Sequence, residues 1–358
     1  MSQEPFFSIT IPTYNRSEYL QSAIGSVLLQ DFNNFEIVVS DNSSDNKSEK
    51  ICKQFNDKRI CYSKNKTNIG FVNNLYKVIK RARGKYIFLL GDDDIILRKN
   101  TFSRVYDLIK KKKYGYIRLK FVLRDNFNRL LSVPWNDLEK APLKFLKKNS
   151  QDLDIYKFLQ NSIFGFISGN IFKNFKNITI PELEGNTKPS FQMERFWIKF
   201  LHQAVKSGGA CLNMDNIIIA RWLPSSDNSH LYDVIDNKIF LEKSWELFFR
   251  DLSTKEQSNW IKEKTEGTIT LLPSIKFYSD RKRLFLNIRR ILQLNHNLYY
   301  QPKFYFSALI AFLMPRSLWK LLKKIYQKSK SLKDPVITKE YGLFRKELSS
   351  SFFYETSI

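Results

Sequence analysis

The feature that most constrains this fold is a regular alternation of short apolar runs and amphipathic segments over about the first 110 residues. The apolar runs predict strands at 7–11, 35–40, 60–63 and 85–90. Apolar residues at helical spacing predict helices at 17–28, 49–55, 71–82 and 100–112. Four successive pairs of strand and helix predict an α/β fold, in which a mostly parallel, Rossmann-like sheet is flanked by helices.

Polar residues gather where three of these strands end. Thr13–Arg16 follows the first strand, Asp41–Asp45 the second and Asp92–Asp94 the fourth. In open parallel sheets, ligands bind beyond the carboxyl ends of the strands. We therefore expect the three clusters to form one site at a single edge of the sheet.

The sequence Gly91-Asp92-Asp93-Asp94 places three carboxylates side by side. Alternate residues of an extended segment share a side, so Asp92 and Asp94 can act together while Asp93 points elsewhere. Like charges this close need a cation or strong hydrogen-bond donors. Mg²⁺ or Mn²⁺ takes one or two carboxylates and completes its shell with phosphate oxygens. A solvated loop, or an aspartate that caps the next helix, is the alternative interpretation.

The other loops supply candidate contacts for a phosphorylated ligand. Asp41 can bind a base or ribose, or can close a turn with its own backbone. Arg16 supplies positive charge to the first loop, or lies at the surface. Asn68 and Gly70 precede a helix, and helix N-termini favour anions. The residues of the first loop that we expect to contact the base and diphosphate are Pro12, Thr13 and Tyr14.

Four segments, in this order and spacing, resemble the family 2 glycosyltransferases of GT-A fold. They are Ser8–Arg16 (SITIPTYNR), Glu36–Asp45 (EIVVSDNSSD), Asn68–Gly70 (NIG) and Gly84–Asp94 (GKYIFLLGDDD). The resemblance covers about residues 6–115. The Gly-Asp-Asp-Asp ending is similar to that of the abequosyltransferase-type branch, whose members build bacterial O-antigen or capsule.

The resemblance implies an inverting transfer of a hexosyl or deoxyhexosyl group from a nucleoside-diphosphate sugar. Asp41 would meet the base or ribose, and Asp92 would lie near the ribose and sugar. Asp94 would bind the Mn²⁺ or Mg²⁺ that bridges the diphosphate, with Asp92 beside it and Asp93 in the donor site. The acceptor would be a glycan or a polyprenyl-diphosphate-linked glycan.

Inversion also needs a general base that takes the proton from the acceptor hydroxyl. The family supplies this base near the start of a later helix, often within a Glu-Asp pair, and this sequence has no such pair there. Glu194 is the candidate, with Asp215 and Glu184 as substitutes, although Glu194 can also simply complement the helix dipole. Arg221 and His230 are candidate diphosphate contacts from a late loop.

The chain is strongly basic, with 59 Lys and Arg against 35 Asp and Glu and a net charge of +24. Residues 236–358 are expected to form a helical, basic extension after a 1–235 catalytic domain, whose donor half is 6–115 and acceptor half 116–235. The apolar run Tyr305–Trp319 is too short to span a bilayer. The basic, amphipathic segment that follows at 320–328 predicts attachment to an anionic membrane surface. A packing or homo-oligomerisation element is the alternative.

Three cysteines without C-x-x-C spacing, and a polar start at Met1–Phe7, favour a reduced cytoplasmic location without a signal peptide. Together with the basic extension, this predicts a peripheral protein at the inner face of the plasma membrane. A nucleotidyltransferase is disfavoured because no Gly-rich, basic phosphate loop follows the first strand. A non-enzymatic scaffold or nucleic-acid-binding protein has no reason to gather acids at one sheet edge and carries no recognisable binding motif.

Overall fold

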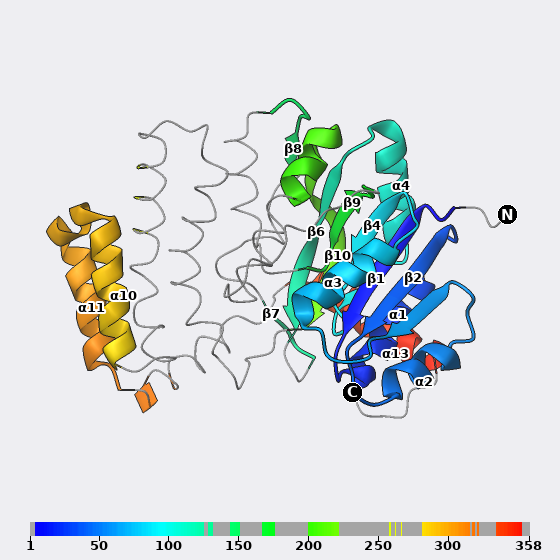
Figure 1. The fold of residues 1–358 in the computed structure, drawn as a ribbon, viewed down its shortest axis with the longest axis horizontal. Coiled ribbons are helices and arrows are strands. Elements are labelled where there is room, and N and C mark those ends of the chain that lie inside the picture. The colour runs from blue at the N-terminus through cyan, green and yellow to red at the C-terminus, as the bar shows by residue number, and fades with distance from the viewer. Residues whose placement is uncertain are drawn as a thin grey trace. The chain divides into compact units, whose positions relative to one another are not determined.

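The structure is a computed structural model, and it describes 4–124, 128–131, 144–150, 167–175, 200–221, 281–315 and 334–352, with a few single positions between them. It forms two compact units, 1–223 with 330–358, and 224–329. The first unit holds a ten-stranded sheet with helices packed against it (Figure 1).

The alternation predicted for the first 112 residues is confirmed. The strands are β1 (Phe7–Thr13), β2 (Phe35–Asp41), β3 (Ile60–Lys64) and β4 (Tyr86–Leu89). The helices are α1 (Ser17–Leu28), α2 (Lys47–Gln54), α3 (Phe71–Arg81) and α4 (Thr101–Lys111). The remaining strands are β5 (Ile95–Ile96), β6 (Tyr116–Arg124), β7 (Leu130–Leu131), β8 (Lys144–Leu146), β9 (Asn170–Lys173) and β10 (Ala210–Arg221).

The strand order is β3-β2-β1-β4-β9-β6-β10-β5, with β7 and β8 paired to β6 and β10. Strands β1 to β4 run parallel, whereas β9 is antiparallel to both β4 and β6. Because β9 is antiparallel to both of its neighbours, β6 runs in the same direction as β4. Its carboxyl end therefore lies at the same edge as those of β1, β2 and β4.

Both faces of the sheet are buried, as predicted for an α/β fold. Leu20, Ile24 and Val27 of α1 join Phe102 and Val105 of α4 in the core on one face. On the other face, the core includes side chains of α3 and of the helical segment 200–208, namely Leu75, Val78, Ile79, Phe200, Leu201, Ala204 and Val205. Helices on both faces leave the polar sheet edge as the place where a ligand can approach.

Strand β1 extends two residues beyond the predicted end and includes Pro12. Leu90 donates to the Thr10 carbonyl on the β4 side, while Asn42 donates to the Thr13 carbonyl on the β2 side. Pro12 shares the orientation of Thr10, so its missing N–H falls on the side where β4 has already ended at Leu89. The proline therefore removes no ladder hydrogen bond, and the strand continues to the site.

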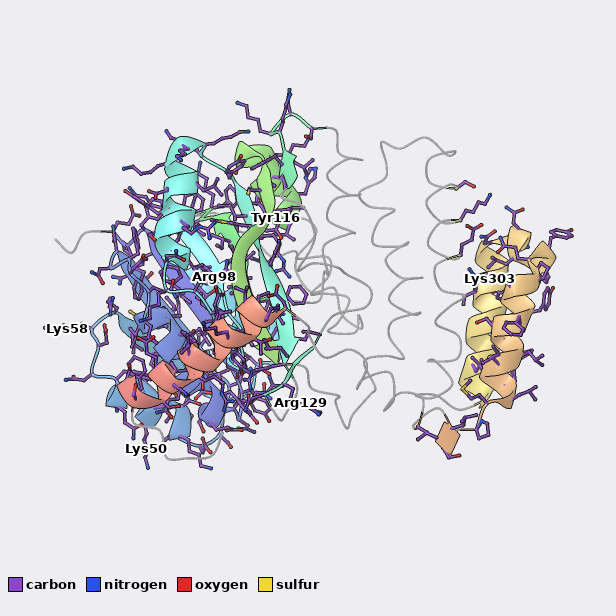
Figure 2. The ribbon with its side chains drawn as sticks, turned by 180° about the vertical axis from the view of Figure 1, so that it is seen from behind. Lys50, Lys58, Arg98, Tyr116, Arg129 and Lys303 are labelled. Atoms are coloured by element: carbon purple, nitrogen blue, oxygen red, sulfur yellow. The ribbon has the colours of Figure 1, made fainter. Side chains whose placement is uncertain are left out.

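The C-terminal region divides differently from the expected boundary at residue 235. Helix α13 (Pro335–Ser351) belongs to the first unit, because Ile337, Tyr341, Phe344 and Leu348 share a core with that unit. Seen from behind, α13 lies across this unit with Arg98 beside it (Figure 2). The second unit includes α10 (Arg281–Leu294), the 3-10 helix η2 (His296–Tyr300) and α11 (Pro302–Leu313), which share a small apolar core of their own.

The cysteines carry no disulfide. Cys52 and Cys211 are buried and Cys61 is half-buried, all as free thiols. Burial raises the pKa of both Cys52 and Cys211 to about 12, so these thiols pack as small apolar groups. Among the described residues, no helix is both long enough and apolar enough to cross a bilayer.

Candidate functional site

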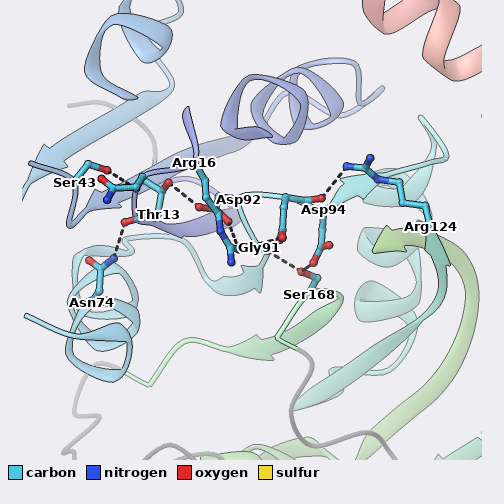
Figure 3. A network of polar contacts seen from close by, with 11 residues as sticks. Thr13, Arg16, Ser43, Asn74, Gly91, Asp92, Asp94, Arg124 and Ser168 are labelled. Atoms are coloured by element: carbon cyan, nitrogen blue, oxygen red, sulfur yellow. Dashed lines mark hydrogen bonds and ion pairs between the residues drawn. The ribbon is translucent and has the colours of Figure 1, made fainter. Parts of the chain in front are cut away.

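The candidate site is built where β1, β2, β4 and β6 end and β9 begins. Thr13, the last residue of β1, pairs in register with Asp41, the last residue of β2. The Thr13 hydroxyl donates to Asp92 Oδ2 at 2.7 Å, which ties the end of β1 to the loop after β4. The three polar clusters predicted from the sequence thus share one edge, and the network between them is shown in Figure 3.

The acidic loop Gly91–Asp94 is buried rather than a solvated surface turn. Asp92 and Asp94 are 5% and 3% exposed. Arg16 Nη1 lies 3.4 Å from Asp92 Oδ1 and 3.1 Å from Asp93 Oδ2. Arg16 is therefore shared by Asp92 and Asp93, whereas Asp94 contacts Ser168.

The electrostatics of the loop leave room for a further positive charge. Burial, followed by the nearby charge of Asp93, raises the pKa of Asp92 to about 7, although Arg16 and Thr13 act in the opposite direction. Burial lowers the pKa of Arg16, but the charges of Asp93 and Asp92 outweigh it and raise that pKa overall. One half-exposed guanidinium therefore does not fully compensate the buried carboxylates.

Asp94 is held by a residue that sequence reasoning missed. Ser168, buried just before β9, accepts a hydrogen bond from the Gly91 N–H at 2.7 Å and donates to Asp94 Oδ2. A Cβ on Gly91 would lie 2.8 Å from Asp94 Oδ2 and 3.2 Å from Ser168 Oγ, so glycine leaves the space for this contact. The interruption of an apolar run by Ser168-Gly169-Asn170 was the available signal.

Asp41 is wholly buried, and both of its carboxylate oxygens have partners within the protein. Oδ1 accepts from the Ser43 N–H at 2.7 Å and Oδ2 accepts from the Tyr62 hydroxyl at 2.8 Å. Ser43 in turn accepts from the Asn15 N–H at 2.8 Å. Asp41 thereby links the loops after β1 and β2. Next to them, the Tyr14 ring is 48% exposed.

A cluster of buried asparagines fixes the loop before α3. Asn74 donates to the carbonyls of Thr13 and Ser40, at 3.3 and 2.9 Å. Asn42 donates to the Gly70 carbonyl at 3.2 Å. Gly70 has φ 79°, a left-handed conformation that suits glycine at the N-cap of α3. Asn68 is exposed and accepts from the Gly70 N–H at 2.9 Å, and the contact of Gly70 with Asn42 places both predicted residues near the end of β2.

Arg124 and Arg221 end two neighbouring strands at this edge. Arg221 is the last residue of β10 and pairs in register with Arg124, the last residue of β6. The Arg124 side chain donates to the Asp93 carbonyl at 3.1 Å, a contact that sequence reasoning did not find (Figure 3). Of the possible general bases, Asp215 lies in β10, whereas Glu184 and Glu194 lie outside the described residues, as does His230.

The donor set of the acidic loop fits a hard divalent cation that shares its shell with a ligand. Within the described residues, no three His, Cys, Asp or Glu side chains converge on a common point. If a divalent cation binds here, Asp92 and Asp94 would be its carboxylate donors, and phosphate oxygens or water would have to supply the other ligands. Burial and the neighbouring charge of Asp93 raise the pKa of Asp92, and a bound cation would act in the opposite direction.

Comparison with known sequences decides the family. Residues 8–172, which contain every strand end just described apart from that of β10, match Glycosyl transferase family 2. This part of the chain belongs to glycosyl transferase family 2. The expectation drawn from the four segments is confirmed. The family 2 match also covers Ser168 and all of β9 except Lys173, beyond the segments that carried the resemblance.

Several curated relatives are similar to the chain. An uncharacterized glycosyltransferase of Methanocaldococcus jannaschii is 41% identical over 43% of this chain and 64% of its own length. Glycosyltransferase GlyG of Streptococcus pneumoniae is 30% identical over 29% of this chain and 35% of its own. WcaA of Escherichia coli, named for colanic acid biosynthesis, is 36% identical over 26% of this chain and 34% of its own. The chain spans less than two thirds of each.

Two solved structures that are similar to this chain hold nucleotide sugars. One is S. aureus TarS 1-349 in complex with UDP-GlcNAc, with 18% identity, a TM-score of 0.48, and coverage of 81% of this chain and 91% of that one. The other is the mannosyltransferase PcManGT from Pyrobaculum calidifontis in complex with GDP-Man and Mn²⁺, with 13% identity, a TM-score of 0.47, and coverage of 87% and 85%.

Proposed function

We propose that this chain is an inverting, metal-dependent glycosyltransferase. It transfers a hexosyl or deoxyhexosyl group from a nucleoside-diphosphate sugar to a hydroxyl of a glycan or lipid-linked acceptor. The observation that supports this most is the pair of buried carboxylates, Asp92 and Asp94, on a loop at the carboxyl edge of a family 2 sheet.

Asp92 and Asp94 hold the divalent cation in this proposal. A bound Mn²⁺ or Mg²⁺ offsets the negative charge that develops on the leaving diphosphate. Thr13 and Ser168 fix one oxygen of each carboxylate, so both side chains are oriented before a ligand arrives. Arg16, whose side chain is 42% exposed, offers a guanidinium to the diphosphate from the outer side of the loop.

The nucleoside lies against the ends of β1 and β2 in this proposal. The exposed ring of Tyr14 offers a surface for stacking of the base. Asp41 is fully buried and supports the same loops through Ser43 and Tyr62, so its contribution to nucleoside binding is indirect in this proposal. Asn68 and Gly70 present the N-terminus of α3 to the anionic part of the donor.

Glu194 is the proposed general base. It accepts the proton of the acceptor hydroxyl while that oxygen attacks the anomeric carbon and the bond from this carbon to the diphosphate breaks. Attack from the face opposite the leaving group inverts the anomeric centre. Arg221, at the end of β10, and His230 are the proposed later contacts to the diphosphate.

The proposed biological role is the assembly of bacterial surface polysaccharide, as O-antigen or capsule. The likeness to WcaA, named for colanic acid biosynthesis, supports this class of product. The alternative of a nucleotidyltransferase has less support, because the family 2 match covers the whole acidic site.

The proposed location is the cytoplasmic face of the membrane. Helix α11 exposes four large apolar side chains on consecutive turns, namely Tyr305, Phe306, Leu309 and Leu313, which are 51–70% exposed. Between Asp280 and Asp334, the sequence has no acidic residue. Apolar side chains within an all-cationic segment suit an anionic lipid surface.

The decisive experiment is a thermal-shift screen of UDP-, GDP-, CDP- and dTDP-sugars with Mn²⁺ or Mg²⁺. A ligand that binds only the native state raises the melting temperature. At a concentration 100 times its Kd, such a ligand adds about 2.7 kcal/mol to the free energy of unfolding. We expect one nucleotide class to raise it only with metal. Asp94→Asn should abolish this shift and lower metal-dependent turnover about 100-fold or more. Unchanged turnover in Asp94→Asn would contradict the proposal.

A further inference from the structure

Helix α13 packs directly against the strand that leaves the acidic loop. Ile95, the residue after Asp94, shares a buried core with Ile337, Tyr341 and Phe344 of α13. Arg98 Nε, just beyond β5, pairs with Glu340 Oε2 at 3.1 Å, although 242 positions separate the two residues. A helix from the far end of the chain therefore supports the segment that carries the metal-binding carboxylates.

A chain of hydrogen bonds continues from α13 to the loop itself. The Tyr341 hydroxyl donates to Asn128 Oδ1 at 3.3 Å. The same oxygen accepts from Arg124 Nη1 at 2.7 Å, and Arg124 Nη2 donates to the Asp93 carbonyl at 3.1 Å. The two terminal nitrogens of one guanidinium thus join Asn128 to the main chain of the acidic loop.

The guanidinium of Arg124 is oriented by its surroundings. Arg124 is 8% exposed, and it is the last residue of β6, so its backbone is fixed by the sheet. Asn128 has φ 58°, a left-handed conformation that asparagine tolerates better than most residues. The Asn128 oxygen sets the direction of Nη1, and the planar fork then sets the direction of Nη2.

Asp93 consequently accepts hydrogen bonds at both its main chain and its side chain. Arg124 holds its carbonyl, and Arg16 holds its carboxylate. Asp92 and Asp94 flank this residue, so a shift of the Asp93 main chain would displace both neighbours. The contact from the α13 side is made to the backbone carbonyl of Asp93 and not to its carboxylate.

We propose that Tyr341 is a positioning residue for the acidic loop, acting through Asn128 and Arg124. Residues 335–351 are then part of the donor site's machinery rather than a separate extension, an inference that rests on the proposed function for its catalytic consequence. The hydroxyl of Tyr341 contributes by orientation, while its ring contributes to the core.

Tyr341→Phe tests this, because it removes the hydroxyl and keeps the buried ring. Hydrogen–deuterium exchange of the full chain should show faster exchange of the amides at 90–96, by about three- to tenfold, the equivalent of one neutral hydrogen bond. Exchange in β1 and β2 should stay unchanged. Mn²⁺ titrated with pyrophosphate, followed by electron paramagnetic resonance, should bind more weakly by a similar factor. Glu347→Gln on the same helix is the matched control, since Glu347 pairs with Lys99 and the chain of contacts from Tyr341 to Asp93 does not include it.

Asn128→Gly gives a second route to the same result, because glycine accepts the left-handed backbone but lacks the amide. Both variants should loosen the loop without a matching fall in melting temperature. Unchanged exchange at 90–96, or faster exchange spread evenly over the unit, would overturn the positioning role. A loop that loosens in a protein whose wild type binds no Mn²⁺ with pyrophosphate would instead overturn the proposed function and leave the positioning role standing.

Discussion

At the residue scale, the acidic loop works because small and hydroxylated side chains surround its carboxylates. Thr13 and Ser168 each donate to one carboxylate, and Gly91 leaves the space in which Ser168 meets Asp94. Three adjacent aspartates would otherwise repel one another in a buried position. In the Gly-Asp-Asp-Asp sequence, the glycine is therefore needed for packing, just as the aspartates are needed for charge.

Gly91→Ala tests the role of packing, because it changes the space beside Asp94 and leaves all three charges in place. Its Cβ would lie 2.8 Å from Asp94 Oδ2, so the Asp94 side chain must move. We expect Mn²⁺ affinity in the presence of pyrophosphate to fall about tenfold, with one hydrogen bond to a charged group lost. The matched control is Gly342→Ala in α13, where a Cβ meets nothing within 4 Å and where alanine should stabilise the helix by about 0.5–1 kcal/mol. Equal Mn²⁺ affinity in wild type and Gly91→Ala would contradict this view of Gly91.

At the element scale, a second polar network lies at the edge of the sheet opposite the site, where β1, β2 and β4 begin. Glu36, near the start of β2, is 3% exposed and accepts from Ser8 Oγ at 2.6 Å. It also accepts from the Arg83 N–H at 2.7 Å and pairs with the Arg83 guanidinium at 2.7 Å. The Gly84 N–H donates to the same Ser8 hydroxyl at 2.7 Å. One carboxylate thus joins β1, β2 and the turn that leads into β4.

Glu36→Gln should lower the free energy of unfolding and leave donor binding and transfer activity unchanged. The amide keeps one acceptor but loses the charge that Ser8 and Arg83 share, which should cost about 1–3 kcal/mol in the free energy of unfolding. Urea denaturation measures the loss. Glu49→Gln, which removes an exposed pair with Lys53 on α2, should leave the unfolding midpoint unchanged. Loss of donor binding in a folded Glu36→Gln protein would show that this edge also shapes the site.

At the scale of the whole molecule, charge and exposed apolar surface suit the proposed attachment to an anionic membrane surface. The net charge is +24, and the exposed face of α11 lies within the part of the sequence that has no acids. Apolar insertion and electrostatic attraction act together at an anionic surface, and only the second is screened by salt.

Vesicle sedimentation tests this surface. Phosphatidylglycerol-containing vesicles should bind the full chain, and binding should weaken at high salt. The double variant Phe306→Ser with Leu313→Ser should reduce vesicle affinity about tenfold or more, since each side chain buried in the lipid contributes about 1.5–3 kcal/mol to binding. The control is Leu343→Ser on α13, which is 60% exposed but lies outside the cationic segment. A dimer that the double variant breaks, in a protein without vesicle binding, would favour oligomerisation instead.

The sequence by itself determined the alternation of strands and helices, the edge on which Thr13, Asp41 and Asp92 meet, and the family. Periodicity and strand-end polarity are local signals, so they are readable over ten residues at a time. Tertiary structure alone decided that Ser168 holds Asp94, that Arg124 holds the Asp93 carbonyl, and that α13 shares a core with Ile95 and Val122. These contacts join residues far apart in the chain, and no local pattern encodes which strand end or which helix will lie next to the acidic loop.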